Sequence, residues 1–161
     1  MNKLYSISIH TLSGLPFSFE NYKGKKILIV NVASQCGLTP QYAQLQELQK
    51  EFGDKLQVIG VPCNDFGAQE PGTANEISTF CETNYHITFP LTEKVKCTGA
   101  DKHPLYQLLT QKELNGHSDS EVVWNFQKYL IDESGQLIAH FHPTIEPLSE
   151  ELLAKAGLSL A

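Results

Sequence analysis

Cys36 stands between two segments of opposite character. Residues 26–34 form an almost unbroken apolar run that predicts a buried strand, and residues 41–52 predict a helix. A cysteine at such a junction lies close to backbone N–H groups that have no partner at the start of the helix. Their partial positive charge favours the thiolate, which is the nucleophilic form of cysteine. The position therefore predicts a reactive thiol, and it is equally compatible with an inert core cysteine.

Three uncharged hydrogen-bond donors occur in or beside loops further along the chain. Gln69 lies in a segment shaped by glycines and a proline, 63–72, and Trp124 and Asn125 come directly before a predicted strand. Amide and indole N–H groups that converge on a sulfur would stabilise a thiolate and an oxyanion leaving from it. Each residue also has an ordinary structural interpretation, as a solvated amide, a core indole and a turn residue.

The elements that must position these residues follow from apolar runs and turn signals. The expected strands are 4–9, 16–19, 26–32, 56–61, 88–91, 126–131 and 136–141. The expected helices are 40–52, one that Thr73 or Asn75 caps and that runs to about residue 84, one that begins at Pro104, and 149–156. This order predicts an α/β fold with a central mixed sheet flanked by helices and an N-terminal β-hairpin. In such sheets functional residues gather beyond the carboxyl ends of the parallel strands, where Cys36 and the 63–72 loop both lie.

Composition narrows the classes of function. The 161 residues are expected to form a single domain, and their net charge of −6 argues against binding to nucleic acid or to anionic membranes. The chain has twelve lysines and no arginine, so no guanidinium can clamp a carboxylate or phosphate. The N-terminus lacks the apolar core of a signal peptide, and no segment is long enough to span a bilayer. We expect a cytoplasmic protein without stable membrane insertion.

The cysteine spacing excludes two common sites. Cysteines occur at 36, 63, 81 and 97, and none forms a Cys-x-x-Cys pair, which removes the main support for a thioredoxin-type dithiol or a zinc ribbon. The six histidines lack the spacing of metal ligands, so no metal or cofactor is expected. On this evidence Cys63 and Cys97 are expected to be small structural residues.

Three segments resemble the signature blocks of the glutathione peroxidase family. They are NVASQCG at 31–37, VPCNDFGAQEPG at 61–72 and WNF at 124–126, in the order and with the separations of that family. Similarity at 88–91, 103–106 and 143–147 extends the resemblance over nearly the whole chain. The resemblance implies a thioredoxin-like fold and the reduction of hydrogen peroxide and of organic or lipid hydroperoxides.

The resemblance also implies residue roles. Cys36 would be the peroxidatic cysteine, and Gln69, Trp124 and Asn125 would complete a catalytic tetrad. Cys81 matches the resolving cysteine that forms an internal disulfide in some members, although on sequence alone it would be a core residue of a helix. If that helix is intact, bridging is expected to require local unwinding, because a disulfide tolerates about 7 Å between α-carbons.

The resemblance is to the monomeric branch, since residues 108–123 lack the insertion that builds the tetramer contact in other members. An open monomeric site would admit bulky hydroperoxides. The lack of arginine and the internal thiol of Cys81 favour thioredoxin over glutathione as reductant. Two alternatives remain: a peroxide sensor that passes oxidation to a partner protein through the same residues, and a non-enzymatic thioredoxin-fold binding or metal-carrier module.

Overall fold

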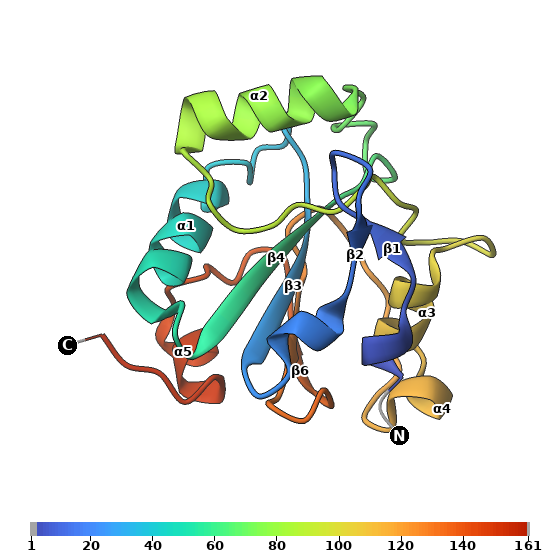
Figure 1. The fold of residues 1–161 in the computed structure, drawn as a ribbon, viewed down its shortest axis with the longest axis vertical. Helices are drawn as coiled ribbons and strands as arrows, with labels where there is room; N and C mark the ends of the chain where they lie inside the picture. The colour runs from blue at the N-terminus through green and yellow to red at the C-terminus, as the bar shows by residue number, and fades with distance from the viewer. Residues whose placement is uncertain (1–2, 161) are drawn as a thin grey trace.

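A four-stranded mixed sheet forms the centre of the computed structural model, which describes residues 3–160 (Figure 1). Strand β3 (Lys26–Val32) pairs in parallel with β4 (Leu56–Pro62) and antiparallel with β5 (Lys128–Ile131). Strand β6 (Leu137–Phe141) pairs antiparallel with β5, which gives the order β4-β3-β5-β6. A parallel strand pair joined through a helix and followed by an antiparallel hairpin is the thioredoxin-like arrangement, so the predicted fold class is confirmed.

Two hydrophobic clusters lie on opposite faces of the sheet, because successive side chains of a strand point to opposite sides. Helices α1 (Gln41–Phe52) and α5 (Glu150–Lys155) pack on one face, and α3 (Pro104–Thr110) packs on the other. The alternate residues of β3 divide accordingly. The first cluster takes Leu28, Val30 and Val32, and the second takes Ile27 and Ile29. No helix within residues 3–160 is long and apolar enough to cross a membrane.

Helix α2 (Ala74–Tyr85) lies across the end of the sheet at which β3 and β4 finish (Figure 1). It begins with a reciprocal capping box, in which the Glu76 N–H donates to Thr73 Oγ1 at 3.2 Å and the Thr73 N–H donates to Glu76 Oε1 at 2.9 Å. Its bounds agree with the sequence prediction to within a residue. A short helix, α4 (Lys112–Asn115), follows α3.

The predicted N-terminal strand 4–9 is wrong in most of its length. Residues Leu4–Ser6 form a 3₁₀ turn, η1, because Ser6 donates from both N and Oγ to the Lys3 carbonyl, at 3.3 and 2.9 Å. A serine that bonds to nearby backbone in this way competes with strand pairing. The hairpin itself is present but short, with β1 (Ile9–His10) and β2 (Pro16–Phe17); a second 3₁₀ turn, η2 (Phe19–Tyr22), follows it.

The segment expected as strand 88–91 makes isolated bridges rather than a regular strand. Leu91 pairs with Gly60 of β4, and Thr92 pairs with Thr11 of the hairpin. The approach to β4 is so close that a Cβ on Gly60 would lie 2.6 Å from Leu91 Cδ2, which explains the glycine in an otherwise apolar strand.

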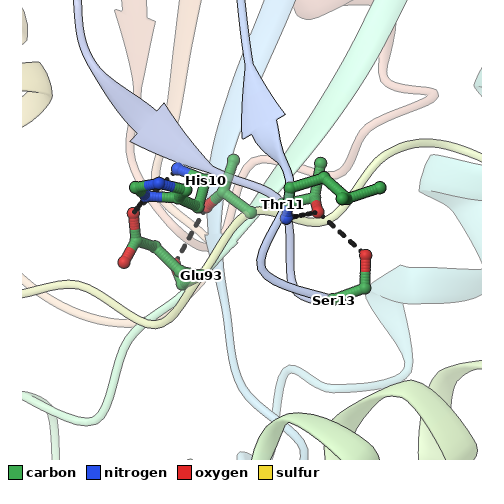
Figure 2. A network of polar contacts seen from close by, with 6 residues as sticks. His10, Thr11, Ser13 and Glu93 are labelled. Carbon is green, nitrogen blue, oxygen red and sulfur yellow. Dashed lines mark hydrogen bonds and ion pairs between the residues drawn. The ribbon is translucent and has the colours of Figure 1, made fainter.

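Polar contacts fasten the hairpin to this segment. The His10 N–H donates to Glu93 Oε2 at 2.8 Å, the His10 ring Nδ1 lies 3.2 Å from the same oxygen, and the Glu93 N–H donates to the His10 carbonyl (Figure 2). Inside the hairpin turn, Thr11 Oγ1 and Ser13 Oγ are 3.0 Å apart. The hairpin therefore extends the sheet beyond β4 through the 91–93 segment.

Candidate active site

Cys36 lies in a compact loop between β3 and α1, with 8% of its surface exposed. The Leu38 N–H donates to its sulfur at 3.3 Å. Thr39 holds the loop closed, because its hydroxyl accepts the Cys36 N–H at 2.9 Å and donates to the Ala33 carbonyl at 2.8 Å. Thr39 was not singled out from the sequence, and a threonine directly before the proline that precedes the helix is the signal that could have indicated it.

The helix start does not act on Cys36 in the way expected from the sequence. Helix α1 begins at Gln41, and tight turns occupy the residues between Cys36 and the helix. The first N–H groups of the helix donate to carbonyls of these turns, from Gln41 to Leu38, from Tyr42 to Thr39 and from Ala43 to Pro40. The expectation of unpaired helix N–H groups beside the sulfur is therefore wrong, and one turn N–H, that of Leu38, takes their place.

Gln69 and Asn125 are brought together from loops 56 residues apart. Asn125 is fully buried, and its Nδ2 donates to Gln69 Oε1 at 3.0 Å and to the Phe66 carbonyl at 3.4 Å. The Gln69 carbonyl in turn accepts the Gln35 N–H at 3.0 Å. The loop that carries Cys36 is thus bonded to the loop that carries Gln69, which is bonded to Asn125.

Trp124 covers the same loop from the side. Its ring lies 5.9 Å from that of Phe66, between centroids, and a Cβ on Gly67 would lie 3.0 Å from the indole. The indole is 38% exposed. Within residues 3–160, neither Trp124 Nε1 nor Gln69 Nε2 donates a hydrogen bond, so both N–H donors are available to a ligand.

Asn31 positions the Trp124–Asn125 pair and was not singled out from the sequence. From β3, its Nδ2 donates to the Trp124 carbonyl at 3.0 Å, and its Oδ1 accepts the Gln127 N–H at 3.1 Å. Its carbonyl accepts the Phe126 N–H at 2.6 Å. A buried asparagine in an otherwise apolar strand was the available signal, because buried polar groups need partners.

Glu70 is a third residue of this site that was not singled out from the sequence. It is 1% exposed, and its Oε1 accepts the Ser34 N–H at 3.1 Å, which adds a second bond between the two loops. The Glu70 N–H donates to Asn64 Oδ1 at 2.9 Å, which closes its own loop. Burial raises the pKa of the Glu70 carboxyl, although the hydroxyl and the N–H of Ser34 oppose this rise.

Cys81 lies on the intact helix α2, buried in the same hydrophobic cluster as Cys36. Both are free thiols. Burial raises the pKa of the Cys81 thiol to about 11, the phenol of Tyr42 opposes this rise, and the charge of Glu70 adds to it. Cys81 also borders a surface pocket of about 580 Å³ between α2, the hairpin turn and residues 86–91.

The other two cysteines lie on the opposite face of the sheet, in the second hydrophobic cluster, and both are free and buried. Within the part of the chain that the structure describes, no group of three or more His, Cys, Asp or Glu side chains is placed to hold a metal ion.

Comparison with known proteins shows which family has this arrangement. The family model described as "Glutathione peroxidase" matches residues 4–110, which is more than half of the chain. The chain belongs to the glutathione peroxidase family. It is a cysteine-based, glutathione peroxidase-like enzyme that reduces hydroperoxides, as the three signature blocks predicted.

Individual members of the glutathione peroxidase family resemble the chain over almost its full length. It is 45% identical over 148 residues to the "Glutathione peroxidase-like peroxiredoxin GPX5" of Chlamydomonas reinhardtii, covering 91% of both chains. It is 45% identical over 154 residues to the "Hydroperoxy fatty acid reductase gpx1" of Synechocystis, covering 91% of this chain and 90% of the other. Among solved structures, the apo form of Trgpx has a TM-score of 0.72 at 31% identity, covering 98% of this chain and 97% of the other.

Proposed function

We propose that Cys36 is the peroxidatic nucleophile of this enzyme. Its thiolate attacks one peroxide oxygen, the O–O bond breaks, and water or an alcohol leaves, which converts the cysteine to a sulfenic acid. One observation carries the proposal: hydrogen bonds join the Cys36 loop, the Gln69 loop and Asn125 into one constellation at the carboxyl ends of β3 and β4. Reactive groups gather at this edge in sheets of this type.

Gln69 and Trp124 supply the available neutral donors for this step, and Asn125 completes the set by holding Gln69 in place. The Trp124 indole N–H and the Gln69 amide N–H groups are free to donate. The bond from Asn125 to Gln69 Oε1 fixes the orientation of the Gln69 amide. Donors of this kind stabilise the charge that develops on the leaving oxygen. They add no competing positive charge, so the sulfur remains nucleophilic.

Cys81 is proposed as the resolving cysteine. Its thiol attacks the Cys36 sulfenic sulfur, the S–O bond breaks, and water leaves as an intramolecular disulfide forms. Because Cys81 is buried on an intact helix and protonated at neutral pH, the step requires α2 to open locally, which exposes the thiol and lowers the cost of ionising it.

Thioredoxin is the proposed reductant of that disulfide. The pocket beside Cys81 gives an external thiol a route to one sulfur of the bridge. The chain has no arginine with which to hold the carboxylates of glutathione. We place this cycle in the cytoplasm, where thioredoxin is kept reduced.

Hydroperoxy fatty acids are proposed as substrates besides hydrogen peroxide. A relative of similar length and 45% identity is named a hydroperoxy fatty acid reductase. The exposed Trp124 offers apolar surface beside the Gln69 loop, which is bonded to the loop that carries Cys36. We propose that the protein is a monomer, which leaves that side open.

Steady-state turnover tests these assignments. Hydrogen peroxide and a fatty acid hydroperoxide would each be supplied with thioredoxin or with glutathione, to wild type, Cys36→Ser and Cys81→Ser. We expect no turnover in Cys36→Ser, loss of thioredoxin-dependent turnover in Cys81→Ser, and faster turnover with thioredoxin than with glutathione. Full activity of Cys36→Ser would overturn the nucleophile, and equal use of glutathione that survives Cys81→Ser would overturn the reductant.

A further inference from the structure

Cys63 and Cys97 take no part in the proposed cycle, yet the fold brings them together. Cys63 directly follows β4, and Cys97 lies 34 residues later in the loop that leads to α3. They are 0% and 1% exposed and belong to the hydrophobic cluster on the face opposite Cys36 and Cys81. The sheet therefore separates this pair of thiols from the candidate active site.

Asp65 joins the two segments. Its N–H donates to Cys63 Sγ at 3.5 Å, and its Oδ2 accepts the Cys97 N–H at 2.7 Å and the Thr98 N–H at 3.1 Å. Despite the burial of the Asp65 carboxyl, hydrogen bonds from the Cys97 and Thr98 N–H groups, with a smaller effect of the Cys63 thiol, hold its pKa below its ordinary value. Lys96 lies 3.4 Å from Asp65 Oδ1 with its own side chain 53% exposed, so the thiols lie just beneath the surface.

The backbone also holds the two segments side by side. The Val95 N–H donates to the Pro62 carbonyl at 3.0 Å, one residue before Cys63 and two residues before Cys97. Burial raises the pKa of the Cys97 thiol well above its ordinary range, and the neighbouring Cys63 thiol adds to this rise.

An orphaned hydroxyl lies in the same hydrophobic cluster. Tyr106 Oη on α3 is fully buried and has no hydrogen-bond partner among the described residues. Burial raises the pKa of the Tyr106 phenol well above its ordinary range, and Cys97 and Cys63 add to this rise. A buried donor without a partner is unfavourable, so a hydroxyl in this position is suited to a group that becomes a better acceptor when the sulfur is oxidised or ionised.

We propose that Cys63 and Cys97 are a second redox-active pair, which closes to an intramolecular disulfide when hydroperoxide is in excess. When the loop opens, the Cys63 sulfur attacks one oxygen of ROOH, the O–O bond breaks, and ROH leaves with the thiol proton. The Cys97 sulfur then attacks the Cys63 sulfenic sulfur, and water leaves with the hydroxyl and the thiol proton. Two thiols are oxidised to one disulfide, and one hydroperoxide is reduced.

Burial sets the rate of this reaction relative to that of Cys36. The pair reacts when the loop opens locally, so it is oxidised more slowly than a thiol held in a preformed site. Once closed, the bridge fixes the base of the 63–72 loop, which carries Gln69, to the loop before α3. The disulfide thus forms when hydroperoxide is in excess, in a part of the fold that also positions the candidate active site.

The test uses the Cys36→Ser/Cys81→Ser double variant, in which Cys63 and Cys97 are the remaining cysteines. The folded protein is exposed to excess hydrogen peroxide, alkylated with N-ethylmaleimide, unfolded, alkylated again and analysed by intact mass and by non-reducing digestion. We expect the loss of both alkylated thiols and a peptide that links Cys63 to Cys97, both reversed by dithiothreitol. Retention of both thiols, or their conversion to sulfinic acids without a link, would overturn the proposal.

The Cys97→Ala change in the same double variant is the matched control. It is expected to abolish the linked peptide and to leave Cys63 singly oxidised. Wild type gives a result that does not depend on whether the variants fold. It is expected to form one disulfide at limiting peroxide and two in excess. A wild-type digest that links Cys63 to Cys36 or to another chain instead would also overturn the proposal. Because the outcomes in the double variant are read without Cys36 and Cys81, failure there is distinct from failure of the proposed catalytic cycle.

Discussion

At the residue scale, the site depends on which polar groups are paired and which are free. Asn125 Nδ2 donates to Gln69 Oε1 and to the Phe66 carbonyl, and Asn125 Oδ1 is buried without a partner within residues 3–160. The indole of Trp124 is unpaired and half-exposed. An arrangement that leaves donors unused in the resting protein is suited to a ligand or charge that appears only during the reaction.

The Gln69–Asn125 bond predicts coupled effects on activity. Asn125→Ala and Gln69→Ala are each expected to lower kcat/KM for hydrogen peroxide by about 10²-fold, the usual loss for one donor of this type. Because the two side chains share a hydrogen bond, the double variant is expected to lose far less than the product of the two. Stopped-flow oxidation of Cys36 measures each rate, and fully multiplicative losses would show that the two residues act independently.

The pKa of Cys81 predicts a pH dependence of stability. Its folded value of about 11 exceeds its ordinary value of 9.0, because of burial above all. Between these pH values the folded protein holds a proton at Cys81 that the unfolded chain releases, so the free energy of unfolding falls as pH rises. Urea unfolding of wild type and Cys81→Ala across this range is expected to show a steeper fall in wild type. Parallel curves would contradict the assignment.

At the element scale, α2 must be stable enough to bury Cys81 and weak enough to release it. Its N-terminus depends on the capping box of Thr73 and Glu76, and its C-terminus ends at His86, a non-glycine residue in the left-handed region at φ 51°. Much of the outer face of α2 is exposed, so few buried contacts hold the helix in place. Local opening is expected to start at its two ends.

Removal of the α2 cap is expected to speed disulfide formation. Thr73→Ala should cost about 1 kcal/mol of stability and raise the rate at which the Cys36–Cys81 disulfide forms after peroxide addition, because α2 opens more readily. Ser149→Ala is the matched control, since Ser149 caps α5 through the Leu152 N–H at 3.3 Å. It should cost a similar free energy without changing that rate. Equal acceleration by both variants would point to general destabilisation instead.

At the scale of the whole molecule, one buried lysine joins three parts of the chain. Lys128 on β5 is fully buried, and its Nζ donates to Gln41 Oε1 at the start of α1 and to the carbonyls of Pro143 and Ile145, at 2.5, 2.9 and 2.6 Å. Three acceptors match the three N–H groups of an ammonium. The contact ties the first turn of α1, which follows the Cys36 loop, to the segment after β6.

This lysine predicts a second pH dependence, of opposite sign. Burial lowers the pKa of Lys128 from 10.5 to about 7, while the charge of Glu146 opposes the change. Between these values the unfolded chain binds a proton that the folded protein does not, so this group makes the free energy of unfolding rise with pH. The wild-type value minus that of Lys128→Met is expected to increase from about pH 7 upward. A difference independent of pH would show that the ammonium persists in the fold.

Much of the fold could be predicted because most helices, strands and turns are determined by residues close together in the sequence. The apolar run of β3, the Thr73 cap and the turn between β5 and β6 each act within a few residues, and the observed bounds agree closely with those expected. The prediction failed at 4–9, where serine bonds replace strand pairing, and at 88–91, where pairing depends on partners at Gly60 and Thr11.

The sequence by itself determined the chemistry: a cysteine after a buried strand, three neutral donors and a candidate partner thiol, in blocks that match one family. Tertiary structure alone decided how these groups meet. It gave the Cys36 sulfur the N–H of Leu38 rather than a helix start, turned Asn125 toward Gln69, and bonded the Cys97 N–H to Asp65 beside Cys63. The physical reason is range, because strand and helix signals act between neighbours, whereas each of the last two contacts joins residues more than thirty positions apart.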